Sequence, residues 1–255
     1  MAKIKKEMTK WESAEIAANL SAIAYMNATK GQKASKAMGF TKARLIAKDG
    51  AEVLVAYSPT TLWFAFRGTE PSKLNDVLAD LKVLKRKAEA GGRVHSGFQD
   101  EVDELWDDLK LELIKNDQRQ KPRDVYVTGH SLGGGMATIA ASRCEAKAVY
   151  TFGSPRVGNA KFVNTLDCPH YRFVNNNDIV CKVPPALLLF KHDGECVYFN
   201  AYGNVRNLTA WQKTKDMFRG IWAGWKQGKF FDMFTDHGIG NYVNNVARKV
   251  EEETK

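Results

Sequence analysis

One stretch of sequence decides the fold of this chain: Val127-Thr128-Gly129-His130-Ser131-Leu132-Gly133-Gly134. A β-rich run precedes it, and small apolar residues, typical of a helix packed tightly on a sheet, follow it. Glycines stand two residues before and two residues after Ser131, because a sharp strand-to-helix turn leaves no room for side chains there. Such a turn exposes the serine hydroxyl and directs the Leu132 N–H at whatever the hydroxyl attacks. The alternative is a glycine-rich helix start with a capping serine.

Strands and helices alternate on both sides of this turn. The β-rich runs are 52–57, 61–66, 124–127, 146–152, 171–174 and 195–199, and helical spacing of apolar residues occurs at 16–23 and 98–113. This alternation predicts an α/β fold with a predominantly parallel central sheet flanked by helices. We expect one domain over residues 1–255, with functional residues at the carboxyl ends of the strands.

The composition is ordinary for a globular protein, with 44% hydrophobic and 26% charged residues among 255. The net charge of +9 favours anionic partners, but no nucleic-acid-binding module accompanies it, so we expect no nucleic-acid partner. The four cysteines show no C-x-x-C spacing, which argues against a zinc site and a disulfide framework.

The first residues carry lysines, but no uninterrupted apolar core follows them. The sequence therefore predicts neither a signal peptide nor a transmembrane segment. We expect a cytoplasmic protein or one exported without a leader, and the oligomeric state stays open.

A serine nucleophile needs a histidine base and an acid that orients the base. With the serine turn in mid-chain, the acid and then the histidine should follow it, while His130 must point away along the turn. Asp178 directly follows a strand and is the best acid; three others follow no convincing strand: Asp167, Asp193 and Asp236. His192 and His237 both remain as bases. Spacing favours His237, since His192 follows Asp178 closely in sequence, and the small residues around His237 leave room for its imidazole.

The oxyanion of a tetrahedral intermediate needs preplaced donors. Leu132 supplies one N–H by the geometry of the turn. The second donor should come from the turn after the strand that ends at Phe66, which is Arg67-Gly68-Thr69. We interpret Arg67 as a structural ion-pair partner.

Several motifs, in this order, resemble the fungal-type class 3 triacylglycerol lipases and their bacterial relatives: Phe66-Arg67-Gly68-Thr69, Val94-His95-Ser96-Gly97-Phe98, the turn at 129–133, Thr151-Phe152-Gly153-Ser154-Pro155-Arg156-Val157-Gly158-Asn159, Arg172-Phe173-Val174-Asn175-Asn176-Asn177-Asp178-Ile179-Val180 with Pro184-Pro185, and Asp236-His237 with Tyr242. The resemblance spans roughly residues 10 to 245 and points to a bacterial-type member. It implies the α/β-hydrolase fold, a triad of Ser131, Asp178 and His237, and an oxyanion hole of Thr69 and Leu132. It implies no metal and no organic cofactor.

Two segments beside these motifs have two interpretations each. Segment 71–84 carries one apolar stripe, formed by Leu74, Val77, Leu78 and Leu81. The stripe fits an ordinary surface helix, or a lid that resembles the lids of lipases. Segment 208–234 mixes aromatic residues with lysines, which fits a helix that covers the core, or an acyl-chain wall or membrane-facing patch.

The sequence therefore predicts a carboxylic ester hydrolase that cleaves acylglycerols or other fatty-acyl esters through a serine acyl-enzyme. Its partners would be a lipid or small-molecule ester and, transiently, a lipid interface. A phospholipase A1 or a feruloyl (aryl) esterase remains an alternative within enzymes. A catalytically silent lipid-binding member is the alternative outside them.

Overall fold

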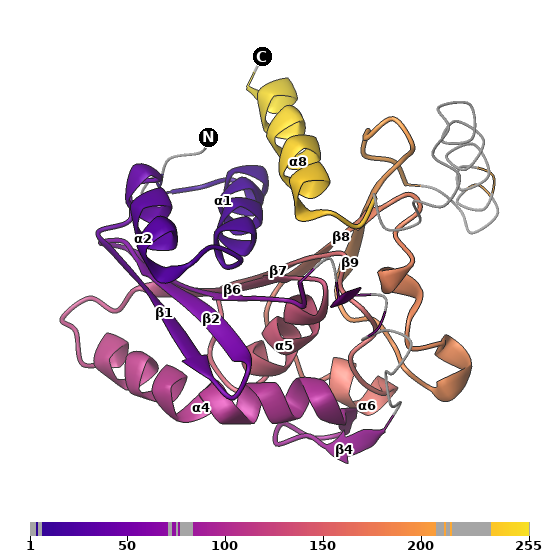
Figure 1. Cartoon of the computed structure of the whole chain (residues 1–255), viewed down its shortest axis with the longest axis horizontal. Coiled ribbons are helices and arrows are strands. Elements are labelled where there is room, and N and C mark those ends of the chain that lie inside the picture. The colour runs from indigo at the N-terminus through magenta and orange to yellow at the C-terminus, as the bar shows by residue number, and fades with distance from the viewer. Residues whose placement is uncertain are drawn as a thin grey trace.

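The centre of the molecule is a seven-stranded sheet in the order β1-β2-β3-β6-β7-β8-β9 (Figure 1). The computed structural model describes residues 4, 7–70, 73, 74, 76, 84–207, 212, 215 and 236–254. The strands of the sheet are β1 (Lys42–Lys48), β2 (Ala51–Tyr57), β3 (Thr61–Phe66), β6 (Asp124–His130), β7 (Ala148–Phe152), β8 (His170–Asn175) and β9 (Glu195–Phe199). The pairs β1–β2 and β2–β3 are antiparallel, and all later pairs are parallel. The predicted, predominantly parallel sheet is confirmed.

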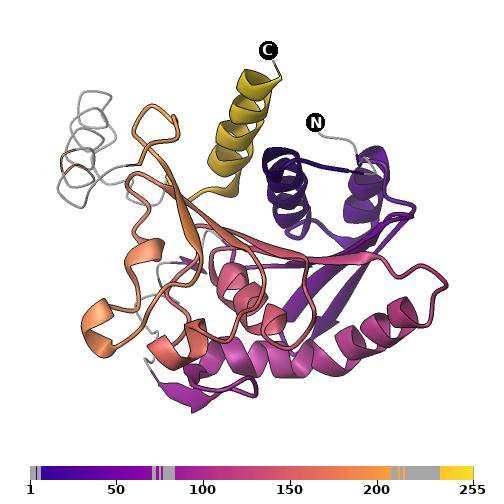
Figure 2. The same cartoon turned by 180° about the vertical axis from the view of Figure 1, so that it is seen from behind.

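Helices cover both faces of this sheet, as the views from the front and from behind show (Figures 1 and 2). The longer helices are α1 (Lys10–Ile23), α2 (Ala28–Ala37), α4 (Ser96–Asp117), α5 (Leu132–Ala141) and α8 (Ile239–Glu253). The short ones are α6 (Ala160–Val163), η2 (Val180–Lys182) and η3 (Ala186–Leu188), and β4 (Lys85–Lys87) pairs with β5 (Arg93–His95) in a separate hairpin. No helix in these described ranges is long and apolar enough to cross a membrane.

Two hydrophobic clusters form the core, one on each face of the sheet. Alternate residues of one strand divide between them: Phe64 and Phe66 pack with α4 and α5, whereas Trp63 and Ala65 pack with α1 and α8. This division follows from strand geometry, because successive side chains of a strand point to opposite faces of the sheet. Because both faces are covered, the strands of the sheet's middle are buried almost throughout.

Some elements go beyond the sequence analysis. The strand β1, helix α2, the β4–β5 hairpin and helix α8 were not predicted. Helix α1 is buried on more than the one face that its spacing predicted, because α8 packs against it as well as the sheet. Of the predicted lid stripe, Leu74 is 3% exposed, while Val77, Leu78 and Leu81 lie outside the described residues. The aromatic segment 208–234 lies outside them too, apart from residues 212 and 215.

Candidate active site

Ser131 stands between the end of β6 and the start of α5, at φ 59° and ψ −133°. A positive φ is strained for a residue with a side chain. The flanking glycines are sterically required, because a Cβ on Gly129 would lie 2.1 Å from the Gly133 oxygen, and one on Gly133 would lie 2.4 Å from the Phe66 oxygen. Ser131 makes no side-chain capping hydrogen bond, which excludes the capped-helix alternative. The predicted sharp turn is therefore present.

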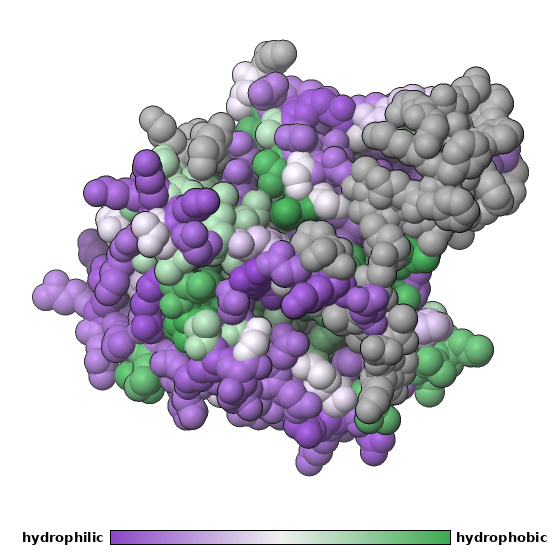
Figure 3. All heavy atoms as spheres, in the orientation of Figure 1, coloured by the Kyte–Doolittle hydropathy of each residue, from purple (hydrophilic) through white to green (hydrophobic). Residues whose placement is uncertain are grey.

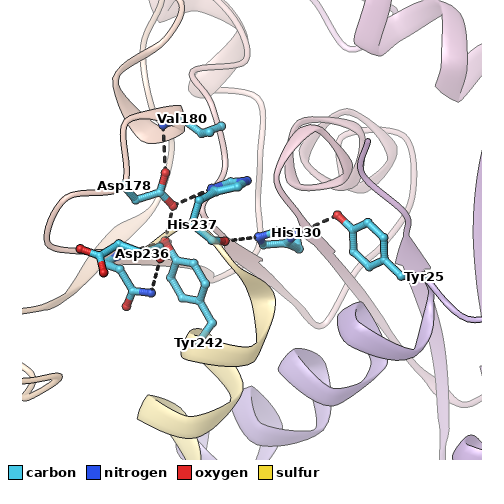
Figure 4. Close-up of polar contacts among 8 residues, drawn as sticks. Tyr25, His130, Asp178, Val180, Asp236, His237 and Tyr242 are labelled. Carbon is cyan, nitrogen blue, oxygen red and sulfur yellow. Dashed lines mark hydrogen bonds and ion pairs between the residues drawn. The ribbon is translucent and has the colours of Figure 1, made fainter. Parts of the chain in front are cut away.

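Asp178 and His237 form a buried pair (Figure 4). His237 Nδ1–H donates to Asp178 Oδ2 over 2.9 Å, and the Tyr242 hydroxyl donates to the same oxygen over 2.5 Å. The Val180 N–H donates to Asp178 Oδ1 over 2.9 Å. Burial raises the pKa of Asp178, but the hydrogen bonds from His237 and Tyr242 outweigh it and lower that pKa below its usual value. Asp178 is therefore a carboxylate that fixes the tautomer of His237.

Two polar atoms of this site have no hydrogen-bond partner among the residues that the structure describes. They are Ser131 Oγ and His237 Nε2, and both are buried. Native proteins rarely leave buried polar atoms unsatisfied, and exceptions are common where chemistry takes place. With Nδ1 donating to Asp178, Nε2 carries a free lone pair, which is the acceptor that a general base needs.

The turn Arg67-Gly68-Thr69 lies against the serine turn. A Cβ on Gly68 would come within 3.0 Å of Ser131 Cβ and 2.5 Å of the His130 oxygen. Arg67 binds Glu52 at 2.7 Å and also contacts Glu70, so its predicted structural role agrees with its contacts. Thr69 is half-buried at the end of this turn, and the roles of Thr69 and Leu132 as oxyanion donors stay predictions.

The ring of His130 packs against the ring of His237, with the ring centroids 4.5 Å apart, and its two nitrogens join two other parts of the site (Figure 4). Its Nε2 lies 2.6 Å from the carbonyl oxygen of His237, which can only accept, so Nε2 carries the proton. Its Nδ1 accepts from the Tyr25 hydroxyl over 2.8 Å. Burial is the main cause that lowers the pKa of His130 to about 3, so the ring stays neutral.

The other histidines of the prediction lie elsewhere. His192 Nε2 donates to the Cys181 oxygen over 2.8 Å, and burial lowers the pKa of His192 to about 3. His170 lies between Asp193 and Thr151, with Nδ1 2.8 Å from Asp193 Oδ2 and Nε2 2.9 Å from Thr151 Oγ1. The structure therefore pairs Asp178 with His237 and gives the other histidines separate partners.

Three functional contacts escaped the sequence analysis, namely those of Tyr25, His130 and Tyr242. Tyr242 follows His237 by five residues, so only its closeness in sequence could have indicated its contact with Asp178. Tyr25 is separated from His130 by 105 residues, and no local pattern joins them.

The described residues hold no group of three or more potential metal ligands from His, Cys, Asp and Glu. Two cavities of about 720 and 500 Å³ are lined, among others, by Cys144 and Asp124 and by Tyr57 and Arg123. None of Ser131, Asp178 and His237 lines either of them.

The known proteins to which this chain is similar are lipases. The model of the family "Lipase (class 3)" matches residues 63–188. The lipase of Rhizomucor miehei is 34% identical over 197 residues, which cover 71% of this chain and 54% of that protein. The lipase of Rhizopus niveus is 32% identical, over 69% of this chain and 48% of that protein. The chain thus spans about half the length of the curated relatives it matches.

Solved structures agree with this match. A structure of the Rhizomucor miehei triacylglyceride lipase superposes with a TM-score of 0.62 and 28% identity, over 75% of this chain and 82% of that one. A fungal lipase at 19% identity has a TM-score of 0.66 and supports the α/β-hydrolase fold alone.

The comparisons overturn one expectation from the sequence. A cytoplasmic protein, or one exported without a leader, was expected, but relatives from Fusarium solani and Malassezia globosa are named secreted mono- and diacylglycerol lipases. The expectation rested on the absence of an N-terminal leader pattern. Such an absence carries no information for a chain that spans only about half of its relatives.

Proposed function

The chain belongs to the class 3 lipase family, and we propose that it hydrolyses carboxylic esters of lipids through a serine acyl-enzyme. The observation that carries the proposal is the buried Asp178–His237 pair, with His237 Nε2 unbonded among the described residues, in a site that also holds the strained Ser131. We propose Ser131, Asp178 and His237 as the catalytic residues. Acylglycerols are the proposed substrates, because the similar proteins are named triacylglyceride and mono- and diacylglycerol lipases.

The proposed reaction begins when His237 Nε2 takes the proton of the Ser131 hydroxyl. The serine oxygen attacks the ester carbonyl carbon, and the resulting oxyanion is bound by the Leu132 N–H and by the N–H and hydroxyl of Thr69. The C–O bond to the alcohol then breaks, and His237 returns the proton to the leaving oxygen. A water molecule repeats the sequence on the acyl-enzyme, which releases the fatty acid and regenerates the serine. Asp178 holds the imidazole in the required tautomer throughout.

The lid, the branch of the family and the choice among related activities are also proposals. Segment 71–84 as a lid is supported by the burial of Leu74, the one residue of its apolar stripe that the structure describes. The relatives are fungal, so a bacterial-type branch has no support among them, and the proposal rests on the family as a whole. A phospholipase A1, an aryl esterase and a silent lipid-binding protein are the competing functions.

A side-by-side assay separates these functions. Purified protein is given triacylglycerol emulsion, phosphatidylcholine vesicles, a methyl ferulate solution and p-nitrophenyl butyrate, with released acid or phenol as the readout. We expect the fastest turnover on the emulsion, and covalent labelling of Ser131 by a p-nitrophenyl alkylphosphonate. Faster turnover on vesicles or on ferulate would select a competing enzyme. Absence of all turnover and of labelling would leave only the silent lipid-binding protein.

A further inference from the structure

A run of exposed apolar residues follows the triad acid in sequence. Residues 185–189 are all exposed, and the exposed fractions are 90% for Leu187, 44% for Leu188 and 69% for Leu189. Leu84, the residue before β4, is 61% exposed. Figure 3 shows apolar atoms at the right-hand edge of the molecule, where Figure 1 places the orange loop that contains η3. We call Leu84, Leu187, Leu188 and Leu189 the leucine rim.

Contacts of the residues next to the rim hold its backbone in place. Phe190 is fully buried, and Arg156 donates to the Pro184 oxygen over 2.9 Å. Lys85 Nζ donates to the Leu188 oxygen over 2.5 Å, which ties the loop to the residue next to Leu84. Leu189 has φ 60°, a conformation that is unfavourable for leucine. The leucines are therefore exposed by a fixed, locally strained backbone.

The loop that bears most of the rim continues in sequence from the proposed site. The Val180 N–H, at the start of η2, donates to the Asp178 carboxylate. Leu84 lies next to this loop, because its neighbour Lys85 donates to the Leu188 oxygen.

The charges of the rim segments have one sign. Residues 84–87 and 182–191 contain five cations and no carboxylate: Lys85, Arg86, Lys87, Lys182 and Lys191. Arg86 contacts Asp100 of α4, and Lys85 lies over the Phe190 ring at 4.5 Å. Exposed apolar tips bordered by lysines match a surface whose interior is hydrocarbon and whose headgroups are anionic.

We propose that the leucine rim docks the protein on an anionic lipid surface, with the leucines in the acyl boundary and the lysines among the headgroups. The inference rests on the proposed function and names the surface on which that function would take place. The rim leucines project from a fixed backbone, so they cannot adjust to a rigid surface. A fluid hydrocarbon layer can surround them without a complementary pocket. A lipid surface also explains the single sign of the neighbouring charges.

The test compares wild-type protein with the triple variant Leu187→Ser, Leu188→Ser, Leu189→Ser. Co-sedimentation is measured with vesicles of phosphatidylcholine alone and with 30% phosphatidylglycerol. Burial of each leucine contributes roughly tenfold, so the triple variant should bind the anionic vesicles at least about a hundredfold more weakly. The matched control is Leu111→Ser, an exposed leucine (52%) on α4, which should bind like wild type. Hydrolysis of dissolved p-nitrophenyl acetate reports the triad separately and should be equal in all three proteins.

Three results would overturn the docking surface. They are wild-type binding by the triple variant, equal wild-type binding to neutral and anionic vesicles, and a wild-type dimer that the triple variant converts to a monomer. The last would show that a second copy covers the rim. Failure of wild-type protein to hydrolyse p-nitrophenyl acetate would instead count against the proposed function, and the vesicle binding would still decide the docking surface.

A second observation concerns the interior. The Gly68 N–H of the oxyanion turn donates to the Tyr25 hydroxyl, which donates to His130 Nδ1, and His130 Nε2–H donates to the His237 carbonyl. Burial raises the pKa of the Tyr25 hydroxyl well above its usual range, so the hydroxyl keeps its proton. Every donor in this chain points the same way, which strengthens each bond.

From this geometry we infer that Tyr25 and His130 are positioning residues, which hold the main chain of His237 at a fixed distance from the oxyanion turn. Neither side chain takes part in proton transfer, because the hydroxyl stays protonated and the ring stays neutral. Misplacing a base by about 1 Å costs on the order of a hundredfold in rate. The role should therefore be visible in turnover.

The test uses Tyr25→Phe, which removes the link without removing the ring. We expect kcat for a dissolved short-chain ester to fall by roughly tenfold to a hundredfold, with KM within about twofold of wild type. Among variants of the next residue, His130→Gln should retain more kcat than His130→Leu, because an amide can both donate and accept. Tyr150→Phe is the control, since Tyr150 is also a buried tyrosine (3% exposed) and its ring packs with Trp63 and Tyr171. If Tyr25→Phe lowers the melting temperature but leaves kcat unchanged, these hydrogen bonds only stabilise the fold, and the positioning role is wrong.

Discussion

Two sets of an aspartate, a histidine and a hydroxyl residue can be compared in the described part of the protein, and they differ in how the histidine and the hydroxyl are bonded. In the set Asp193–His170–Thr151, both ring nitrogens are bonded, at 2.8 and 2.9 Å. In the set Asp178–His237–Ser131, the acid–base bond is equally short, at 2.9 Å, but His237 Nε2 and Ser131 Oγ have no partner among the described residues. An aspartate–histidine pair is therefore not itself evidence for catalysis. The unfilled nitrogen and the strained hydroxyl turn make the difference.

The two sets should differ most in kcat when the hydroxyl of each is removed. Ser131→Ala should lower kcat for p-nitrophenyl butyrate by about 10⁶-fold, because no acyl-enzyme can form. Thr151→Val should leave kcat unchanged and lower the free energy of unfolding by about 1–3 kcal/mol, because His170 Nε2 loses its partner. Turnover and urea unfolding of both variants give the measurement. Equal losses of activity would remove the distinction between the two sets.

Removal of the acid charge should have the next largest effect. Asp178→Asn should lower kcat by about 10⁴-fold, since the amide no longer fixes the tautomer of His237. Asp193→Asn should affect stability alone, by about 1–3 kcal/mol. Steady-state kinetics and thermal unfolding on the same preparations make the comparison. A loss of kcat in Asp193→Asn would mean that the second set contributes to the site.

The buried neutral histidines should make the protein sensitive to acid. Burial lowers the pKa of His130 and His192 to about 3, and it also lowers the pKa of His170. Below pH 6.5 the unfolded chain takes up protons that the folded chain cannot, so stability is lost as the pH falls from about 6.5 towards 3.

His130 and His192 each contribute a slope of about 1.4 kcal/mol per pH unit to the free energy of unfolding. His192→Gln should therefore reduce the slope between pH 6 and pH 4 by about that amount. Urea unfolding at each pH measures it. An unchanged slope in the variant would show that His192 takes up its proton in the folded state.

The smallest effect concerns the strained backbone. Ser131 and Leu189 both have a positive φ, at 59° and 60°. Leu189→Gly should relieve the strain and change the free energy of unfolding by about 0.5–1 kcal/mol in the stabilising direction. Hydrolysis of p-nitrophenyl acetate should stay at the wild-type rate, which separates the strain at the rim from the strain at the nucleophile. Destabilisation by this change would show that the Leu189 side chain contributes packing.

The sequence was sufficient for most of the sheet and for the serine turn, because both leave local patterns. The strand β3 is a run of β-forming residues, and the glycines of the turn are required by contacts of 2.1 and 2.4 Å. It singled out Asp178 as the candidate acid, and the structure pairs this carboxylate with His237. It favoured His237 over His192 by spacing, and the family resemblance strengthened that choice.

The rest depends on contacts between distant parts of the chain. Tyr25 and His130 are 105 residues apart, and Asp193 reaches His170 from outside the sheet, so neither contact leaves a local pattern. Helix α8 was not predicted, although its two buried residues, Tyr242 and Val246, stand four positions apart as on one face of a helix. The strand β1 has an exposed edge, and its mixed burial gives no clear period.

Tyr25 lies just after α1, and this placement has a practical consequence. The first helix and its following residue supply a hydrogen bond to the serine turn but none of the proposed catalytic residues. A protein cut between α1 and α2 would separate the proposed catalytic residues from one of their supports. Reassembly of the two pieces could then be read as restored colour from a chromogenic ester, which makes this loop a natural place to split the enzyme into a two-part reporter.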